Sequence, residues 1–340
     1  MSKRAITYIA SAMIILVVAI FISFWLGHFP ISFLEYKSII MYKLGFKVDL
    51  AHLSKLDEIT IIFRDIRFPR IAAAVLIGAS LSVSGAVFQG MFVNPLVSPG
   101  ILGVLSGASF GAALGMVLRL PWWSVQISAF IFGFIAVFLA LTVAKFYGKG
   151  NGILMLVLGG VISSSLFGAF VSLLKYVADP YDTLPSIVYW MMGSLSSVNL
   201  FEAWIAASLV TLSLVGILIF SKHLNLLSLG EEDAKALGVD VFKTRFFIIF
   251  LATLLSAVSV MLAGVIGWIG LVVPHVARFL IGANHVVLLP FSALIGAIFL
   301  LVVDSISRSL FSVEVPLGIL TSLVGIPVFI WALHRNVKAH

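Results

Sequence analysis

Cysteine is absent from this 340-residue chain, and charged residues make up only 10% of it. Without cysteine, neither a disulfide framework nor a thiolate metal site can form. The scarcity of charge argues against a soluble domain, because such domains usually carry about 25% charged residues. The composition therefore argues that the chain is not a water-soluble globular protein.

Catalytic and nucleotide-binding motifs are also missing. The sequence contains no G-x-x-x-x-G-K-[ST], H-E-x-x-H or G-x-S-x-G pattern, and "YGKGNG" at 147–152 has glycines and a lysine at the wrong spacing for a phosphate loop. We therefore predict that the chain is not an enzyme, with no catalytic residues, metal ligands or cofactor of its own. If the chain transports a substrate against its gradient, the energy must come from a partner protein or from an ion gradient.

The chain is rich in hydrophobic residues. Hydrophobic residues make up 61% of it and the mean hydropathy is +1.20. Apolar runs of about 20 residues recur throughout, which is the length that crosses a bilayer as a helix. The alternating pattern of a membrane barrel is absent. These features predict an all-α polytopic membrane protein. Basic residues give a net charge of +7 but are scattered between the runs, so nucleic acid is not an expected partner.

Hydropathy and helix breakers predict about ten transmembrane helices. The first run could be a signal peptide, but its length and the lack of a small-x-small cleavage site favour a retained span. Gly103, Gly107, Gly111 and Gly115 recur every fourth residue, which predicts close packing against a neighbouring helix. The predicted spans are Ile6–Leu26, Ile71–Met91, Pro95–Leu118, Trp122–Phe146, Ile153–Leu174, Leu200–Phe220, Lys243–Gly264, Val265–Ile281, His285–Ser309 and Leu317–Leu333.

The distribution of basic residues predicts the orientation of these spans. With both termini in the cytoplasm, the inside loops carry most of the lysines and arginines, and the short outside loops hold only Arg119, Lys175 and Arg308. The long segment 27–70 then lies outside. Its stretch "SFLEYKSIIMYKLGFKV" fits an amphipathic surface element, but a solvated loop is the favoured interpretation.

Three consecutive acids stand out in "GEEDAKALGVD", residues 230–240, within the segment 221–242 between two spans. Gly230 or Ser228 can cap a short helix, the acids suit its first turn, and Gly238 is a natural stop. Two interpretations remain open for this segment. It is either a solvated connector or a docking helix for a soluble partner.

Charges also gather at the outer ends of two spans. In "RFPR", residues 67–70, Pro69 predicts a helix start, and Arg67 and Arg70 stand one turn apart as exposed cations that suit carboxylate partners or anchor the helix at the interface. Asp304 and Arg308 are spaced for an internal pair. We expect Asp304 to be structural and Arg308 to be shared with the surface.

The ordered motifs of the chain resemble the permease subunits of bacterial ATP-binding-cassette importers for iron-siderophores, haem and cobalamin (FecCD/BtuC-like type II importers). The resemblance covers nearly the whole chain after the first span. It rests on "RFPR" (67–70), "GASLSVSGAVFQGMFVNPLVSPGILGVLSGA" (78–108), "YWMMGSL" (189–195), "LLSLGEEDAKALGV" (226–239), "GWIGLVVPHVARFL" (267–280), "LLPFSALIGAIFLLVVDSISR" (288–308) and "VPLGILTSLVGIPVFIWAL" (315–333).

This resemblance implies the type II importer fold, with residues 1–340 forming one transmembrane domain in the bacterial inner membrane. It also implies a homodimer, two cytoplasmic ATPase subunits that bind ATP and Mg, a periplasmic binding protein and surrounding membrane lipids. Residues 221–242 would form the cytoplasmic coupling loop. The residues expected to contact the ATPase are Gly230, Glu231, Glu232, Asp233, Ala234, Leu237 and Gly238.

The resemblance assigns two further groups of residues. Arg67, Arg70 and Arg308 would receive acidic residues of the binding protein, and Gly150, Asn151 and Gly152 fall where the family has its cytoplasmic gate. The cargo expected from the resemblance is a ferric siderophore or haem, with cobalamin or an oxyanion such as molybdate as alternatives. An ion-coupled secondary transporter is the alternative class, and it would rest on Asp304.

Overall fold

The computed structural model describes residues 3–27, 29, 32–43, 56–147, 152–310 and 313–337, and in these ranges all regular structure is helical. Seven helices are long and apolar enough to cross a membrane, and three further apolar helices are shorter. Together they account for the ten predicted spans and confirm the all-helical class. They are α1 (Lys3–Trp25), α5 (Phe68–Met91), α6 (Val104–Val117), α7 (Trp122–Tyr147), α8 (Gly152–Val177), α10 (Leu200–Ile219), α13 (Val241–Ala263), α14 (Ile269–Ile281), α15 (His285–Ser307) and α16 (Leu317–Val337).

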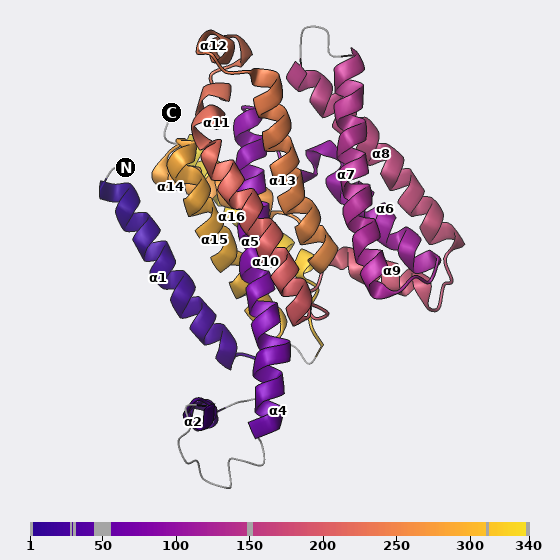
Figure 1. The fold of residues 1–340 in the computed structure, drawn as a ribbon, viewed down its shortest axis with the longest axis vertical. Coiled ribbons are helices and arrows are strands. Elements are labelled where there is room, and N and C mark those ends of the chain that lie inside the picture. The colour runs from indigo at the N-terminus through magenta and orange to yellow at the C-terminus, as the bar shows by residue number, and fades with distance from the viewer. Residues whose placement is uncertain are drawn as a thin grey trace.

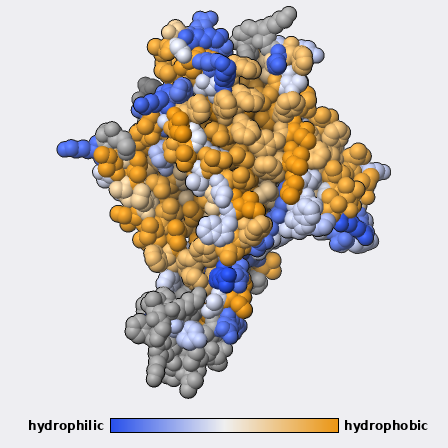
Figure 2. All heavy atoms as spheres, in the orientation of Figure 1, coloured by the Kyte–Doolittle hydropathy of each residue, from blue (hydrophilic) through white to orange (hydrophobic). Residues whose placement is uncertain are grey.

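The hydrophobic surface forms a broad band across the middle of the molecule, with hydrophilic residues gathered toward its two ends (Figure 2). Apolar side chains are stable on such a surface only where lipid replaces water. Exposed examples on α1 include Ile14, Phe21 and Ile22. The band therefore places the bundle in a membrane, as the composition predicts.

Helix α5 is the central helix of the bundle and packs against α15, α13 and α14 (Figure 1). Its stretch 78–86 consists largely of glycine, alanine and serine, which lets neighbouring backbones approach closely. A Cβ atom on Gly78 would lie only 2.2 Å from the Gly296 carbonyl oxygen of α15. Buried hydroxyls add interhelical hydrogen bonds, including Ser82 to the Ser292 carbonyl at 2.7 Å.

The predicted glycine stripe on α6 does pack closely, mainly against α7. Cβ atoms added at Gly107 and Gly111 would each lie 2.3 Å from a backbone oxygen of α7. The prediction that this stripe serves helix packing is therefore confirmed.

Two predicted spans begin later than expected because their first residues are irregular. Residues 92–103 enter the bundle as turns and a short helix, η2 (Pro99–Leu102), before α6 starts at Val104. Residues 264–268 likewise precede α14 at Ile269, with Gly264 and Trp268 at positive φ. The proline at 95 and the glycine at 264 interrupt the helical hydrogen bonds, which hydropathy alone does not detect.

The described residues before α5 are largely helical, which corrects the expectation of a loop there. Helix α2 (Phe33–Lys43) and α4 (Leu56–Ile61) occupy part of the segment 27–70 that was favoured as a loop. Helix α4 continues through a π-helical turn, η1 (Ile62–Arg67), directly into α5. Pro69 lies in the first turn of α5 as predicted, but helical structure already begins at Leu56. The π turn lets the Phe68 amide bond to the Phe63 carbonyl, and Pro69 fits because it follows this shifted register.

Several short helices lie at the two ends of the bundle. Helices α11 (Ser221–Leu227) and α12 (Glu231–Ala236) lie at the end where both chain termini also lie, which we call the α12 end (Figure 1). Helices α2 and α4 lie at the opposite end, which we call the α4 end. Helix α9 (Thr183–Met192) lies toward the α4 end and was not predicted, because its ten residues are too few for a span.

Candidate functional site

The α11–α12 hairpin is held to the bundle by its apolar residues and by several polar contacts. Leu224, Leu227 and Ala234 are buried. The Ser228 hydroxyl donates to the Gly90 carbonyl of α5 at 3.2 Å. The Asn225 side-chain oxygen accepts from the backbone amide of His285, the first residue of α15, at 2.8 Å. The hairpin is therefore tied to two spans of the core.

The predicted short helix is present, and its caps are those of a well-formed helix end. Gly230 occupies the N-cap position at φ +116°, whereas the Ser228 side chain does not cap α12. After Leu237, the Gly238 amide bonds to the Lys235 carbonyl at 2.9 Å and the Val239 amide bonds to the Ala234 carbonyl at 3.0 Å. This pair of bonds is a Schellman motif, which requires a residue at positive φ, here Gly238 at +83°.

The three acids of α12 do not share one environment. Glu231 faces the bundle and contacts Lys235 at 2.9 Å and Arg245 of α13 at 3.4 Å. The hydrogen bond from Lys235 lowers the pKa of Glu231 below its ordinary value. Glu232 and Asp233 are exposed, as is Leu237 with 59% of its surface accessible. The outward face of α12 is therefore acidic around an exposed leucine, and Glu231 belongs to the supporting side.

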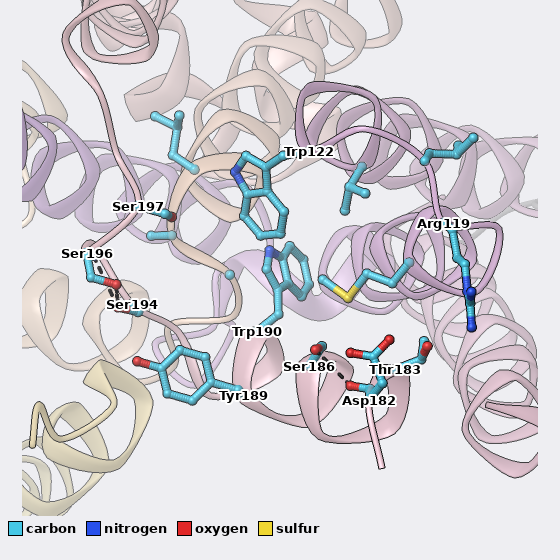
Figure 3. A pocket seen from close by; sticks show the side chains of 16 residues that line it. Arg119, Trp122, Asp182, Thr183, Ser186, Tyr189, Trp190, Ser194, Ser196 and Ser197 are labelled. Carbon is cyan, nitrogen blue, oxygen red and sulfur yellow. Dashed lines mark hydrogen bonds between the residues drawn. The ribbon is translucent and has the colours of Figure 1, made fainter. Parts of the chain in front are cut away.

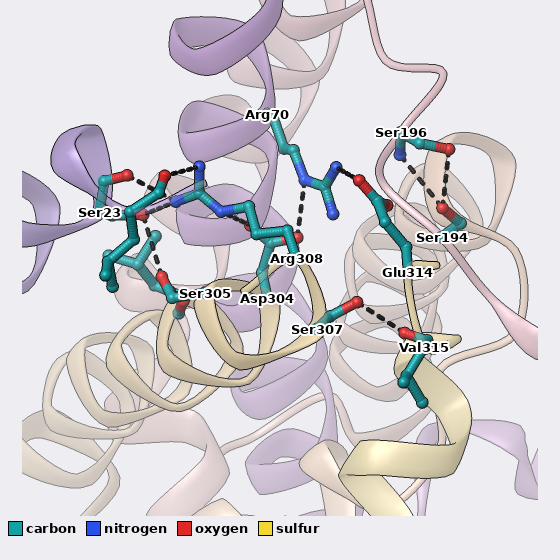
Figure 4. A network of polar contacts seen from close by, with 12 residues as sticks. Ser23, Arg70, Ser194, Ser196, Asp304, Ser305, Ser307, Arg308, Glu314 and Val315 are labelled. Atoms are coloured by element: carbon teal, nitrogen blue, oxygen red, sulfur yellow. Dashed lines mark hydrogen bonds and ion pairs between the residues drawn. The ribbon is translucent and has the colours of Figure 1, made fainter. Parts of the chain in front are cut away.

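An ionic network joins α1, α5 and α15 at the α4 end (Figure 4). Asp304 is fully buried, 2.9 Å from the Arg70 Nε and 3.4 Å from the Arg308 Nε. Arg70 also binds Glu314 at 2.6 Å. Arg308 donates to the Ser23 carbonyl at 2.6 Å and to the Leu26 carbonyl at 2.9 Å. Asp304 therefore lies between Arg70 and Arg308. Arg70 also binds Glu314, and Arg308 also binds the carbonyl groups at the end of α1.

These contacts correct the expected exposure of the outer arginines. Arg67, Arg70 and Arg308 are all buried, with 4–6% of their surface accessible. Arg67 donates to the carbonyls of Phe24 and Phe29, whereas Arg70 donates to the carboxylates of Asp304 and Glu314. Asp304 is structural as expected, but Arg308 is not shared with the surface. The spacing of "RFPR" places the side chains along one helix, whereas the partners come from segments far away in sequence.

A cavity of about 450 Å³ opens at the same end between α6, α7, α9 and the loop after α9 (Figure 3). Trp122 and Trp190 lie side by side in it, with Ser194, Ser196 and Ser197 on one side and Arg119 and Asp182 on the other. Of these residues, the sequence analysis placed Arg119 in an outside loop and included Trp190 and Ser194 in the motif "YWMMGSL", but it did not predict a cavity here. The aromatic pairs in "PWWS" and "YWMM" were the available signal, because tryptophan and tyrosine collect at membrane interfaces.

Of the predicted gate residues, only Gly152 is among the residues that the structure describes, and it is the first residue of α8. Gly150 and Asn151 lie outside the described residues. Within the part of the chain that the structure describes, no group of three histidine, aspartate or glutamate side chains is placed to hold a metal ion.

Comparison with known proteins identifies the family. A model of the FecCD transport family matches residues 15–335, nearly the whole chain. The chain belongs to the FecCD transport family. Its relatives within reach of sequence comparison include the molybdate import system permease protein MolB of Haemophilus influenzae, 41% identical over 93% of this chain and 92% of that protein. The hemin transport system permease protein HmuU of Yersinia pestis is 39% identical over 84% of this chain and 87% of that protein.

A solved structure agrees with this assignment. The chain is similar to a metal-chelate type ABC transporter in an inward-facing conformation, with a TM-score of 0.84, 39% identity, and coverage of 96% of this chain and 98% of the other. This FecCD member is therefore a multi-span membrane permease with the type II ABC importer fold. Permeases of this kind are not themselves enzymes.

Proposed function

We propose that the chain is the permease subunit of an ATP-driven importer, in which a homodimer forms the path and two soluble ATPases drive it from the α12 end. The observation that carries this proposal is the α11–α12 hairpin, whose base is buried in the bundle while Glu232, Asp233 and Leu237 face outward. An exposed leucine within an acidic rim suits docking onto a complementary protein surface. The α12 end would then be cytoplasmic, in a bacterial inner membrane.

The contacts of the hairpin offer a route for transmitting movement. Ser228 is bonded to α5 and Asn225 to α15. A displacement of α12 by the ATPases would therefore pull on two core spans together, as in a rigid-body switch between outward and inward access. Gly230, Ala234 and Gly238 would shape the helix, whereas Glu232, Asp233 and Leu237 would contact the ATPase.

We predict that changing Glu232 and Asp233 together to alanine releases the ATPase. The loss of two rim charges should weaken the complex about tenfold, which corresponds to about 1.4 kcal/mol. The measurement is the amount of the cognate ATPase that co-purifies with the tagged chain in mild detergent. A matched control changes Asp179 and Asp182, two exposed acids beside α9, and should leave the ATPase bound. If both variants retained the same amount of ATPase, α12 would not be the docking element.

The cargo we propose is a metal chelate, a ferric siderophore or haem, delivered by a periplasmic binding protein. The name of HmuU and the structural neighbour favour this class. Molybdate is the second candidate, favoured by the 41% identity to MolB, and cobalamin is a further one. Uptake of radiolabelled ferric chelate, haem, cobalamin and molybdate, measured in cells that carry the full importer, would separate these candidates. Vanadate should block the uptake, whereas an ionophore should not.

The ion-coupled alternative loses support from the geometry of Asp304. That carboxylate was its candidate ion ligand, and it is held between Arg70 and Arg308. Two guanidinium groups beside one carboxylate repel a further cation.

We also propose that the binding protein docks at the α4 end, where Arg70 would exchange its partner Glu314 for a carboxylate of the binding protein. Glu314 is the most accessible partner in the network, with 30% of its side chain exposed, whereas Arg70 is 8% exposed. A carboxylate of the binding protein would replace Glu314 on Arg70, while Arg67 and Arg308 keep the end of α1 in place.

Changing Glu314 to glutamine tests this exchange. Removing the competing carboxylate should tighten the binding protein severalfold at low salt, because a charge-assisted pair to arginine is about twice as strong as a neutral hydrogen bond. Affinity can be measured by surface plasmon resonance on the permease in nanodiscs. The control is Glu202 to glutamine, since that residue caps α10 away from the network. Weaker binding in the Glu314 variant would show that Glu314 itself contacts the partner.

A further inference from the structure

A groove of about 820 Å³ lies at the α12 end between α7, α13 and the bundle-facing side of α12. Its walls are mostly apolar and include Phe138 and Phe146 from α7 and Phe242 and Phe246 from α13. One turn beyond the lining residues, the rings of Phe134 and Phe250 meet at 5.6 Å and join the two helices. The groove is therefore an open-sided slot between two spans.

The groove extends deep along both spans. Phe138 and Phe146 are eight residues apart on α7, which corresponds to about 12 Å along the helix axis. Both side chains are exposed, at 70% and 73% of their surface, and Phe242 is exposed at 72%. Because α7 and α13 are membrane spans, this apolar slot lies at the depth of the acyl chains, whereas its mouth beside α12 lies at the depth of the headgroups.

Cations surround the mouth of the groove. Lys145 is in the last turn of α7, Lys235 is on α12, and Arg245 is in the second turn of α13. Among the described residues, Glu231 is the one acid that lines the groove, against the three cations Lys145, Lys235 and Arg245. The pairing is incomplete at Arg245, whose two terminal nitrogens lie 3.4 Å from the Glu231 oxygen. Its buried Nε has no hydrogen-bond acceptor among the described residues.

From this combination we infer that the groove binds one anionic glycerophospholipid from the leaflet at the α12 end. The phosphate would lie between Lys145 and Arg245, and an acyl chain would lie along the phenylalanines. Basic pockets between spans favour such headgroups, and apolar walls at acyl-chain depth favour the tails. A water-soluble ATPase cannot enter a slot that runs about 12 Å into the membrane. The inference rests on membrane embedding and not on the proposed transport function.

The test uses the purified full-length chain in mild detergent and native mass spectrometry. Palmitoyl-oleoyl phosphatidylglycerol is the anionic probe and palmitoyl-oleoyl phosphatidylcholine the zwitterionic one. We expect one phosphatidylglycerol to bind well before further copies, and phosphatidylcholine to bind more weakly. Arg245→Gln and Lys145→Gln should each weaken phosphatidylglycerol about fivefold, since a basic residue near a membrane surface contributes about 1 kcal/mol.

A charge-matched control is Lys222→Gln, which removes an exposed lysine at the same end but outside the groove. It should leave phosphatidylglycerol binding unchanged. Lys145 is itself exposed, so its variant will fold even where the Arg245 variant does not. Equal binding of the two lipids, or equal losses in the groove and control variants, would overturn the inference.

Two further measurements distinguish the phospholipid from other possible occupants of the groove. Millimolar sodium phosphate should not displace the bound phosphatidylglycerol, and displacement would show a site for a free anion only. Adding the cognate ATPase should leave the lipid bound. Loss of the lipid on ATPase binding, or loss of a dimer in Lys145→Gln, would assign the groove to a protein partner and overturn the lipid site.

Discussion

Changing Asp304 to asparagine is expected to lower the free energy of unfolding by about 3–5 kcal/mol, because it leaves buried arginine charge without its central partner. The substitution keeps the shape of the side chain, removes its charge and replaces one acceptor oxygen with an NH2 donor. Arg70 retains Glu314, whereas Arg308 is left with the hydroxyl of Ser23 and the carbonyls that end α1. The measurement is an unfolding titration of the purified chain in detergent, with the folded yield as a second readout.

A matched substitution at the same end separates burial from charge. Asp65 is paired with Arg64 at 3.8 Å, but the two side chains are 52% and 68% exposed. Changing Asp65 to asparagine should cost less than about 1 kcal/mol, since exposed ion pairs contribute little. If the two variants proved equally stable, the network would not stabilise the junction of α1, α5 and α15. A second change, Arg308 to methionine, should partly restore stability to the Asp304 variant by removing the unpaired charge.

The spans could be predicted from the sequence because a membrane leaves few solutions for an apolar chain. Runs of about 20 apolar residues must form helices to satisfy their backbone groups. The predicted spans at Pro95 and Val265 failed at their starts, where the backbone is irregular and its polar groups find partners close by in sequence. The Ile101 amide bonds to the Ser98 carbonyl at 3.1 Å, and the Leu271 amide bonds to the Trp268 carbonyl at 3.0 Å. Hydropathy cannot distinguish an apolar turn from an apolar helix.

The sites could be predicted only where the signal is local. The caps of α12 depend on residues within one turn, so the glycine at 238 was interpretable from sequence. The environment of Glu231 depends on Arg245, fourteen residues away, and the burial of Arg70 depends on Asp304 and Glu314, more than 230 residues away. Spacing along one helix shows which side chains are neighbours on it, and gives no information about which other helix covers them. The arginines were therefore expected in solvent and lie inside the bundle.

Close contact between α5 and α14 leads to the second large prediction, a loss of folded protein when Gly85 is changed to alanine. The added Cβ would lie 1.8 Å from the Gly270 carbonyl oxygen and 2.7 Å from its Cα. Those atoms are backbone, so the clash cannot be relieved by a rotamer change and the helices must move apart. Overpacking in a core usually costs about 1–3 kcal/mol, and a contact to backbone atoms should reach the upper end of that range.

The comparison that isolates this clash is Gly168 to alanine in α8. A Cβ there would meet no atom within 4 Å, and alanine is the better helix former by about 1 kcal/mol. The Gly168 variant should therefore be as stable as the parent chain or slightly more stable, while the Gly85 variant unfolds at a lower denaturant concentration. If both variants behaved alike, α5 and α14 would not be in backbone contact at Gly270.

The Gly85 substitution should also affect α16. The irregular turn 264–268 leads into α14, so separating α14 from α5 would move Trp268, which packs against Phe329 of α16 at 6.4 Å between ring centres. The same substitution should consequently disturb three spans at once, and a folded remnant would show slower transport as well as lower stability.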